Sequence, residues 1–139
     1  MTIQEIQDEI VDEFSMFDDW MQRYEYIIDL GKSLPLIDEQ FKTEDNIIKG
    51  CQSKVWVHAE QQGEKVVFTA DSDAILTKGI IAILIRAFSN QKAADILEAN
   101  TDFIDKIGLK EHLSPTRANG LVSMVKKIKM YALAFNAKN

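Results

Sequence analysis

The sequence predicts an α+β fold in which helices cover a small antiparallel β-sheet. Three observations lead to this prediction. Apolar residues recur at helical spacing near both ends of the chain, two β-branched and aromatic runs follow one another in its middle, and a long apolar segment comes directly after them. With 139 residues and 46% hydrophobic content, the chain can build one sizeable core, so we expect a single domain over residues 1–139.

Two helices are expected at the start of the chain. Thr2 and Glu5 have the spacing of a capping box, and the apolar residues that follow predict a helix from Ile3 to about Met16. A second helix is expected after Asp19, with its end at Gly31, because glycine commonly terminates helices.

The only cysteine is expected in a loop beside a β-hairpin. Residues 41–50 have no sustained period and are rich in polar side chains, so they predict a loop that leads to Cys51. The runs 54–58 and 65–70 are typical of strands, and residues 60–64 around Gly63 are expected to turn between them. Cys51 should therefore lie where the chain enters the first strand, near the sheet edge.

The second half of the chain is expected to be helical. The predicted helices cover residues 74–88, a short stretch that Ser89 and Asn90 cap and that ends at Leu97, residues 101–107, and the segment from Pro115 to about Phe135. Oxygens of Asp71, Ser72 and Asp73 should cap the first of these, since a calcium loop would need several more ligands. Gly79 inside that helix indicates close packing, and Ser114 before Pro115 is expected to cap the last helix.

Charge and composition exclude several functional classes. A net charge of -6 argues against a nucleic-acid partner, because phosphate binding needs a basic surface. The N-terminus has no signal-peptide pattern and no apolar run is long enough to cross a membrane, so a cytoplasmic protein is expected. One cysteine and two histidines provide neither a disulfide nor a clustered metal site. No motif for a bound cofactor is present.

Two interpretations of Cys51 fit the residues alone. The segment Gly50-Cys51-Gln52-Ser53 can project a reactive sulfur from a loop, whereas a free cysteine can also be a small buried apolar group. Neither histidine is placed as a base by the sequence: His58 is expected at the end of a strand and His112 in a surface turn. On the residues alone, both interpretations stay open.

The order of motifs from Phe14 to Ala134 is more specific than any single residue, and it resembles the SufE/CsdE family of sulfur acceptors. The motifs that carry the resemblance are Trp20-x-x-Arg-Tyr24, Ile27-Ile28-Asp29-Leu30-Gly31, Leu34-Pro35, Asn46-Ile47-Ile48-Lys49-Gly50-Cys51-Gln52-Ser53-Lys54-Val55-Trp56, Ala70-Asp71-Ser72-Asp73-Ala74, Lys78-Gly79, and His112-Leu113-Ser114-Pro115-Thr116-Arg117-Ala118-Asn119-Gly120-Leu121.

The resemblance implies a SufE/IscU-like fold and a carrier that takes persulfide sulfur onto Cys51 from a SufS-type cysteine desulfurase, whose activity it stimulates. Pyridoxal phosphate belongs to that partner, and no cofactor or metal is expected on this chain. The sulfur would pass to a downstream iron–sulfur scaffold. The chain would thus act as a sulfurtransferase-like carrier and activator rather than as a stand-alone enzyme.

The resemblance also suggests which residues support Cys51. Arg117 is a candidate for docking the desulfurase or supporting charge, although it also fits an ordinary exposed arginine in the first turn of a helix. The other candidates for docking or for tuning the loop are Asp73, Gly50, Gln52 and His112. Two rival functions stay open: a regulator that binds the desulfurase without carrying sulfur, and a redox-sensing thiol protein.

Overall fold

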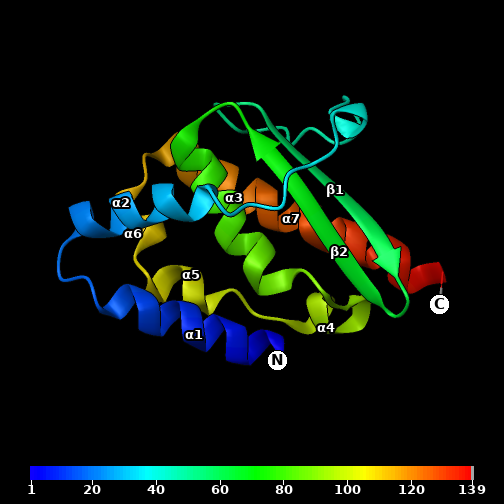
Figure 1. Ribbon diagram of the computed structural model, residues 1–139, viewed down its shortest axis with the longest axis horizontal. Coiled ribbons are helices and arrows are strands. Elements are labelled where there is room, and N and C mark those ends of the chain that lie inside the picture. The colour runs from blue at the N-terminus through cyan, green and yellow to red at the C-terminus, as the bar shows by residue number, and fades with distance from the viewer. Residues whose placement is uncertain (139) are drawn as a thin grey trace.

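The structure is a computed structural model that describes residues 1–138, in which helices pack on one side of an antiparallel sheet of strand order β1-β2-β3 (Figure 1). The strands are β1 (Val55–Gln62), β2 (Lys65–Ser72) and β3 (Gln91–Lys92). The helices are α1 (Ile3–Ser15), α2 (Trp20–Gly31), α3 (Ile75–Phe88), α4 (Ala93–Glu98), α5 (Asp102–Lys106), α6 (Leu109–His112) and α7 (Pro115–Lys138), with a 3₁₀ turn at Glu39–Phe41. The predicted α+β fold is confirmed.

The first two helices begin as the sequence predicts. The Thr2 hydroxyl accepts a hydrogen bond from the Glu5 amide at 3.1 Å, and the Thr2 amide donates to the Glu5 carboxylate at 2.9 Å. These two bonds are the predicted capping box. In α2, the Asp19 carboxylate accepts from the Gln22 amide at 2.8 Å. Local side-chain chemistry thus defines where both helices start.

The hairpin turn is tighter than predicted. β1 and β2 stay paired up to Gln62 and Lys65, so only Gly63 and Glu64 connect them instead of the whole of residues 60–64. Gly63 has φ +63°, which glycine adopts without strain in a two-residue hairpin turn. His58 consequently lies inside β1, not at its end as predicted, and its ring stacks on Phe41 at 3.8 Å between centroids.

The strand β3 was not predicted, and the residues directly before it were predicted to have a different role. Ser89 and Asn90 were predicted to cap a helix, but the Ser89 hydroxyl accepts from the Phe68 amide at 2.9 Å and α4 has no side-chain cap. Asn90, at φ +65°, donates its amide to the Val66 carbonyl at 2.8 Å. These residues turn the chain so that Gln91 pairs with β2. The reason is tertiary, because the partner strand lies far back in the sequence.

The core forms around α3, which is buried along nearly its whole length. Alternate residues of the strands, including Val57 and Phe68, face this helix and α7, while α1 and α2 pack on other sides of it (Figure 1). A Cβ atom on Gly79 would lie 2.1 Å from the Ile27 carbonyl oxygen, so the predicted close packing is confirmed at the crossing of α2 and α3. The sheet and α7 are therefore held against a rigid central helix.

The predicted capping of α3 is wrong for Asp71 and Asp73, whereas the Ser72 hydroxyl does accept a hydrogen bond from the Ala74 amide, directly before the helix, at 3.3 Å. The N-cap residue is Ala74, whose side chain cannot accept a hydrogen bond, and β2 extends to Ser72, so the two aspartate carboxylates bond elsewhere. The Asp71 carboxylate pairs instead with Lys42 at 2.9 Å and with Lys78 at 3.5 Å. Asp71 thus links the segment before the hairpin to the first turn of α3.

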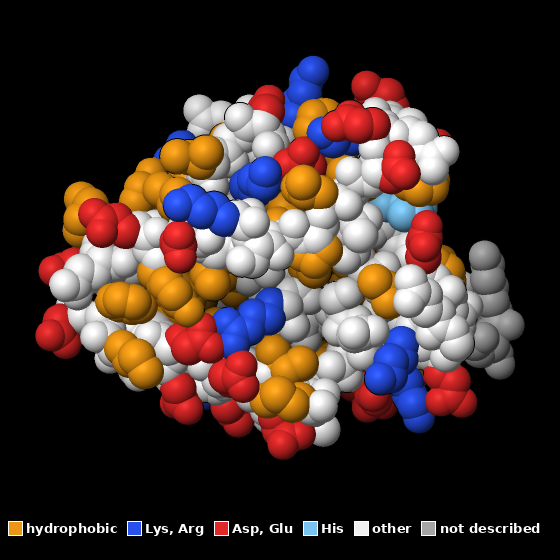
Figure 2. Space-filling model, viewed as in Figure 1, with side chains coloured by type: hydrophobic (Ala, Val, Ile, Leu, Met, Phe, Trp, Pro, Cys, Tyr) orange, Lys and Arg blue, Asp and Glu red, His pale blue; other side chains and the backbone are white. Residues whose placement is uncertain are grey.

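A second charged cluster ties α1 to α3. Acidic side chains gather along the lower edge of the molecule, where α1 lies (Figure 2). Arg86 of α3 donates to Glu9 at 2.6 Å and to Glu13, and the hydroxyl of Tyr26 also donates to Glu13. Burial raises the pKa of Tyr26 to about 12, with the Glu13 carboxylate adding to the shift.

In residues 1–138, no helix combines the length and apolar character of a membrane span.

Candidate functional site

The cysteine lies at the tip of a short loop with a hinge-like glycine. The Ile48 amide donates to the Val55 carbonyl at 2.8 Å and the Val57 amide donates to the Asn46 carbonyl at 2.9 Å, so the chain on both sides of the loop is fixed to β1. Between these anchors, Gly50 has φ +90°, a conformation that other residues adopt only with strain. The predicted position of Cys51, in the loop that enters β1, is confirmed.

Asp73 holds the far end of this loop. Its carboxylate accepts from the Lys54 amide at 3.1 Å, and its own amide donates to the Lys54 carbonyl at 3.2 Å. The Ser72 hydroxyl donates to the same carbonyl at 2.8 Å. The side chain that was expected to cap α3 therefore joins the end of β2 to the cysteine loop, an arrangement that suits a loop-tuning residue.

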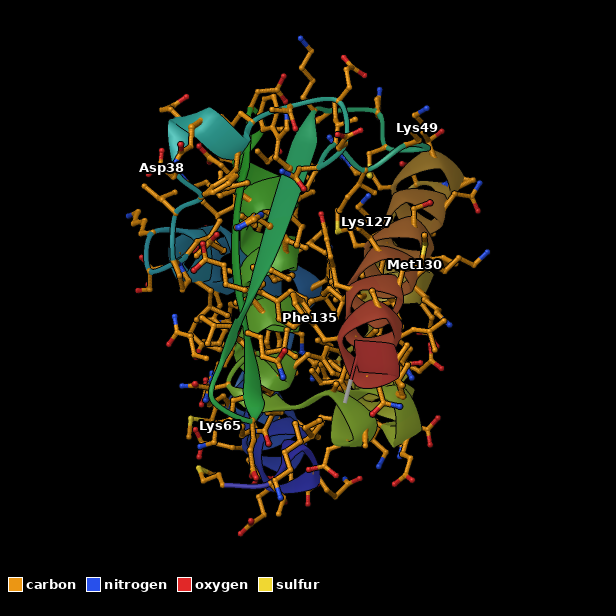
Figure 3. All side chains as sticks on the ribbon, turned by 90° about the vertical axis from the view of Figure 1, so that its right-hand side faces the viewer. Asp38, Lys49, Lys65, Lys127, Met130 and Phe135 are labelled. Atoms are coloured by element: carbon orange, nitrogen blue, oxygen red, sulfur yellow. The ribbon has the colours of Figure 1, made fainter. Side chains whose placement is uncertain are left out.

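The start of α7 covers the cysteine. Ser114 caps this helix as predicted, since its hydroxyl accepts from the Arg117 amide at 3.3 Å. The loop lies over the first turns of α7, as the position of Lys49 in Figure 3 shows. A Cβ atom on Gly120 would lie 3.2 Å from the Cys51 sulfur, and that sulfur donates a weak hydrogen bond to the Gly120 carbonyl at 3.7 Å. The absence of a side chain on Gly120 makes this contact possible.

A small cavity lies next to the sulfur. Its volume is about 10 Å³, close to the lower limit for holding one water molecule. The residues that line it are Cys51, Gln52, Ser53, Thr77, Ile80, Arg117, Gly120 and Met124. The structure thus brings three predicted site residues, Cys51, Gln52 and Arg117, to one place from the loop and from α7. A space of this size can take a single additional atom beside the sulfur.

The environment of Cys51 favours the neutral thiol. The side chain is half-buried, and this burial raises the pKa of the thiol, because removal from water disfavours the thiolate. Arg117 is exposed although it lines the same cavity. The closed loop therefore protects the sulfur from reagents in solution, since the thiolate is the reactive form.

His112 is not part of this cavity. Among the described residues, those that line the space beside Cys51 do not include it. Its ring stacks on Trp20 at 4.3 Å between centroids, and its Nδ1 lies 3.0 Å from the Gly108 carbonyl. These contacts join α6 to the start of α2.

Thr77 was not among the predicted site residues, although it lines the cavity beside Cys51. It lies on α3, at a position whose helical neighbours Ile80 and Ile81 are buried. A polar residue on the buried side of an apolar helix is the signal that could have identified it. Gly120 did belong to the motifs that carry the resemblance, but its contact with Cys51 could not be inferred from the sequence.

A larger cavity offers no comparable chemistry. It has a volume of about 610 Å³ and lies between the start of α1, the end of α2 and β2, with mostly apolar side chains around Arg86. Arg86 is already paired with Glu9 and Glu13. Within residues 1–138, no group of three or more His, Cys, Asp or Glu side chains is arranged to hold a metal ion. The cysteine loop is therefore the candidate site.

Comparison with a solved structure supports the fold. A hypothetical protein from Thermus thermophilus, whose structure was determined in solution, superposes with a TM-score of 0.77 over 93% of this chain and 94% of its own. Its sequence is only 19% identical, so the similarity concerns the fold alone.

Sequence comparisons identify the family. An uncharacterized SufE-like protein of Rhizobium meliloti (strain 1021) is 43% identical over 90% of this chain and 93% of its own length. SufE-like protein 1 of Arabidopsis thaliana, named chloroplastic/mitochondrial, is 41% identical over 94% of this chain, which spans 35% of that longer protein. Residues 8–132 match the family model named SufE and described as an Fe-S metabolism associated domain. The chain therefore belongs to the SufE family, whose role lies in iron–sulfur metabolism.

Proposed function

We propose that this protein is a sulfur acceptor that takes a persulfide sulfur from a SufS-type, pyridoxal phosphate-dependent cysteine desulfurase onto Cys51 and passes it on for iron–sulfur cluster assembly. Membership of the SufE family implies a cysteine desulfurase partner. The observation that carries the proposal is a half-buried cysteine on a glycine-hinged loop, beside a cavity of about 10 Å³. This space suits one carried sulfur atom.

The transfer is a thiol exchange. The Cys51 thiolate attacks the terminal sulfur of the partner's cysteine persulfide, a new bond to the Cys51 sulfur forms, and the partner's own sulfur–sulfur bond breaks. The partner cysteine leaves as a thiolate, so no external oxidant or reductant is needed. Docking must open the loop first, because the closed loop packs the Cys51 sulfur against Gly120.

Opening also changes the reactivity of the thiol. Burial raises the Cys51 pKa in the closed loop, so movement into water lowers it again and increases the thiolate fraction. Docking would therefore couple exposure of the sulfur to its activation. Once loaded, the loop closes and shields the persulfide from other thiols.

We propose that residues 1–139 act as one domain in the cytoplasm, without nucleic acid or membrane as partner, and that an iron–sulfur scaffold receives the sulfur. One cluster of buried side chains extends from Ile3 to Ala132, which supports the single domain. The Arabidopsis thaliana relative is named chloroplastic/mitochondrial. Cell fractionation therefore tests the proposed cytoplasmic location of this protein.

A loading experiment tests the proposal. The protein is incubated with a cysteine desulfurase and L-cysteine, and mass spectrometry then measures the addition of one sulfur atom at Cys51. We expect loading of the parent and of a control variant away from the cysteine loop, Lys65→Ala, but not of Cys51→Ser. Cys51→Ser should also melt close to the parent temperature, because the half-buried sulfur contributes little to the core.

The same variants separate the rival functions. If Cys51→Ser still stimulates the desulfurase as well as the parent does, the protein is a regulator and the carrier role is wrong. If no sulfur is accepted but peroxide produces a stable sulfenic acid at Cys51, the protein is a redox sensor.

A further inference from the structure

Thr77 is an unusual buried residue. It is 7% exposed and lines the cavity beside the Cys51 sulfur. Gln7 is the other buried polar residue in the described part of the chain, and its side-chain amide donates to the Asn100 carbonyl at 2.9 Å. The Thr77 hydroxyl, by contrast, makes no hydrogen bond with any residue from 1 to 138. A threonine inside a helix commonly bonds to the carbonyl four residues earlier, and this one does not.

The unpaired hydroxyl has free space beside it. No fully enclosed side-chain oxygen or nitrogen in the described residues lacks a partner, so the Thr77 oxygen cannot be sealed inside the core. Thr77 lines the cavity beside Cys51, which offers its hydroxyl such a space. Burying a hydroxyl without a partner costs free energy, and this cost falls away when a hydrogen-bond acceptor enters the space.

We propose that the Thr77 hydroxyl donates a hydrogen bond to the terminal sulfur of the Cys51 persulfide and thereby holds the loaded loop closed. The inference rests on the proposed function, since the sulfur concerned is the one that the desulfurase supplies. Thr77 is then a binding residue for the carried sulfur.

The dimensions and the chemistry agree with this role. A sulfur–sulfur bond is about 2.05 Å long, so the terminal sulfur occupies the first free space beyond the Cys51 sulfur. That space has room for one atom, and Ile80 and Met124 provide apolar walls. A terminal persulfide sulfur carries negative charge when ionised, and hydrogen bonds to charged acceptors are stronger than those to neutral ones. Arg117, exposed at the same cavity, adds a positive charge nearby.

The Thr77 hydroxyl should have opposite effects in the unloaded protein and in the protein that carries a persulfide on Cys51. In the unloaded protein it is unpaired, so Thr77→Val should leave stability unchanged or raise it slightly, because valine has nearly the same shape without the polar group. In the loaded protein the same change removes the hydrogen bond. A residue with a purely structural role would not distinguish the two states.

The test loads Cys51 without a desulfurase. Inorganic polysulfide is added to the whole protein, the Cys51 thiolate attacks one of its sulfur atoms, and the shortened polysulfide leaves. The species with one added sulfur is selected by mass. Dithiothreitol then removes that sulfur as hydrogen sulfide and becomes its cyclic disulfide, and the rate is measured for the parent, Thr77→Val and Thr77→Ser. Alkylation of the unloaded thiol by a maleimide is the control for loop opening.

We expect Thr77→Val to lose its sulfur about tenfold faster than the parent, which corresponds to about 1.4 kcal/mol, with unchanged alkylation of the unloaded thiol. Thr77→Ser should retain most of the protection because it keeps the hydroxyl. Equal rates of sulfur loss in Thr77→Val and the parent would overturn the inference. The inference would also be overturned if Thr77→Val accelerated sulfur loss and alkylation by the same factor, because that result would mean that the cysteine loop opens more often. Failure of a desulfurase to load Cys51 would contradict the proposed function while leaving these rates valid.

Discussion

Two glycines inside helices, Gly79 of α3 and Gly120 of α7, both lie where another part of the chain comes close, but their neighbours differ. A Cβ atom on Gly79 would lie 2.1 Å from a backbone oxygen, that of Ile27 in α2. A Cβ atom on Gly120 would lie 3.2 Å from the side-chain sulfur of Cys51. The first contact joins two helices that cannot move apart without exposing the core. The second joins a helix to a loop.

The difference shows that a close approach can serve either stability or function. At Gly79 the backbones of α2 and α3 touch, and Gly31 faces the same crossing, where its own Cβ would lie 3.0 Å from the Gly79 nitrogen. At Gly120 the contact closes a loop that must open for the proposed sulfur transfer. Substitutions at the first region should therefore affect unfolding, and those at the second should affect access to Cys51.

The largest effect is expected for Gly79→Ala. The added methyl group collides with the backbone of Ile27, and overpacking of a core costs about 1–3 kcal/mol or more, which outweighs the gain of up to about 1 kcal/mol in helix propensity. We expect urea unfolding to show a loss at the upper end of that range. Gly120→Ala is the matched control and should change stability by less than about 1 kcal/mol, because helix propensity offsets a small displacement of the loop. Equal losses in the two variants would contradict the distinction between the two regions.

Arg117→Ala tests whether the second region is also a docking surface. Arg117 lies in the first turn of α7, and its amide is fixed by Ser114, so its side chain starts from a defined position. We expect the complex with the desulfurase to weaken by about 1.5–3 kcal/mol, the range for a lost hydrogen bond to a charged group, as measured by calorimetry.

Two variants control that measurement. Arg117→Lys should restore only part of the affinity, because lysine lacks the planar fork of the guanidinium. Lys65→Ala removes a positive charge at the opposite end of the sheet and should leave affinity unchanged (Figure 3). Unaltered affinity in Arg117→Ala would show that Arg117 is an ordinary exposed residue.

Asp73→Ala should have a smaller effect, on the closure of the loop. It removes the acceptor for the Lys54 amide, a bond of about 0.5–1.5 kcal/mol, so the loop should open more often. We expect faster alkylation of Cys51 by a maleimide and an almost unchanged melting temperature. Asp73→Asn keeps an acceptor oxygen and should alkylate at the parent rate. If Asp73→Ala also alkylates at that rate, the Ser72 hydroxyl suffices to hold Lys54.

The smallest expected effect is a dependence of stability on pH through Cys51. The folded-state pKa of the thiol is raised by burial, so the unfolded chain loses this proton first as the pH rises. The contribution of the thiol to stability is therefore complete below its unfolded pKa of about 8.5 and is lost as the pH rises through the folded-state pKa. Urea unfolding of the parent and Cys51→Ser over this interval should reveal the difference. Parallel pH curves would mean that the sulfur is not desolvated.

The sequence determined the elements whose signals are local. Capping residues and apolar periodicity predicted α1, α2 and α7, and the β-branched runs predicted the hairpin, because these patterns act between residues a few positions apart. The position of Cys51 in a loop before β1 followed from the same reasoning, and the order of motifs indicated the family that the comparisons confirm.

Only the tertiary structure decided how the site is assembled. The Cys51 sulfur meets the Gly120 carbonyl across 69 positions of sequence, and Thr77 reaches the same cavity from a third element. Asp73, predicted to cap α3, holds the cysteine loop instead, and β3 exists because its partner strand is already in place. Such contacts depend on how helices and strands pack, and packing depends on the fit of whole surfaces. Local patterns cannot specify that fit, since the same residue can cap, pair or pack according to its neighbours in space.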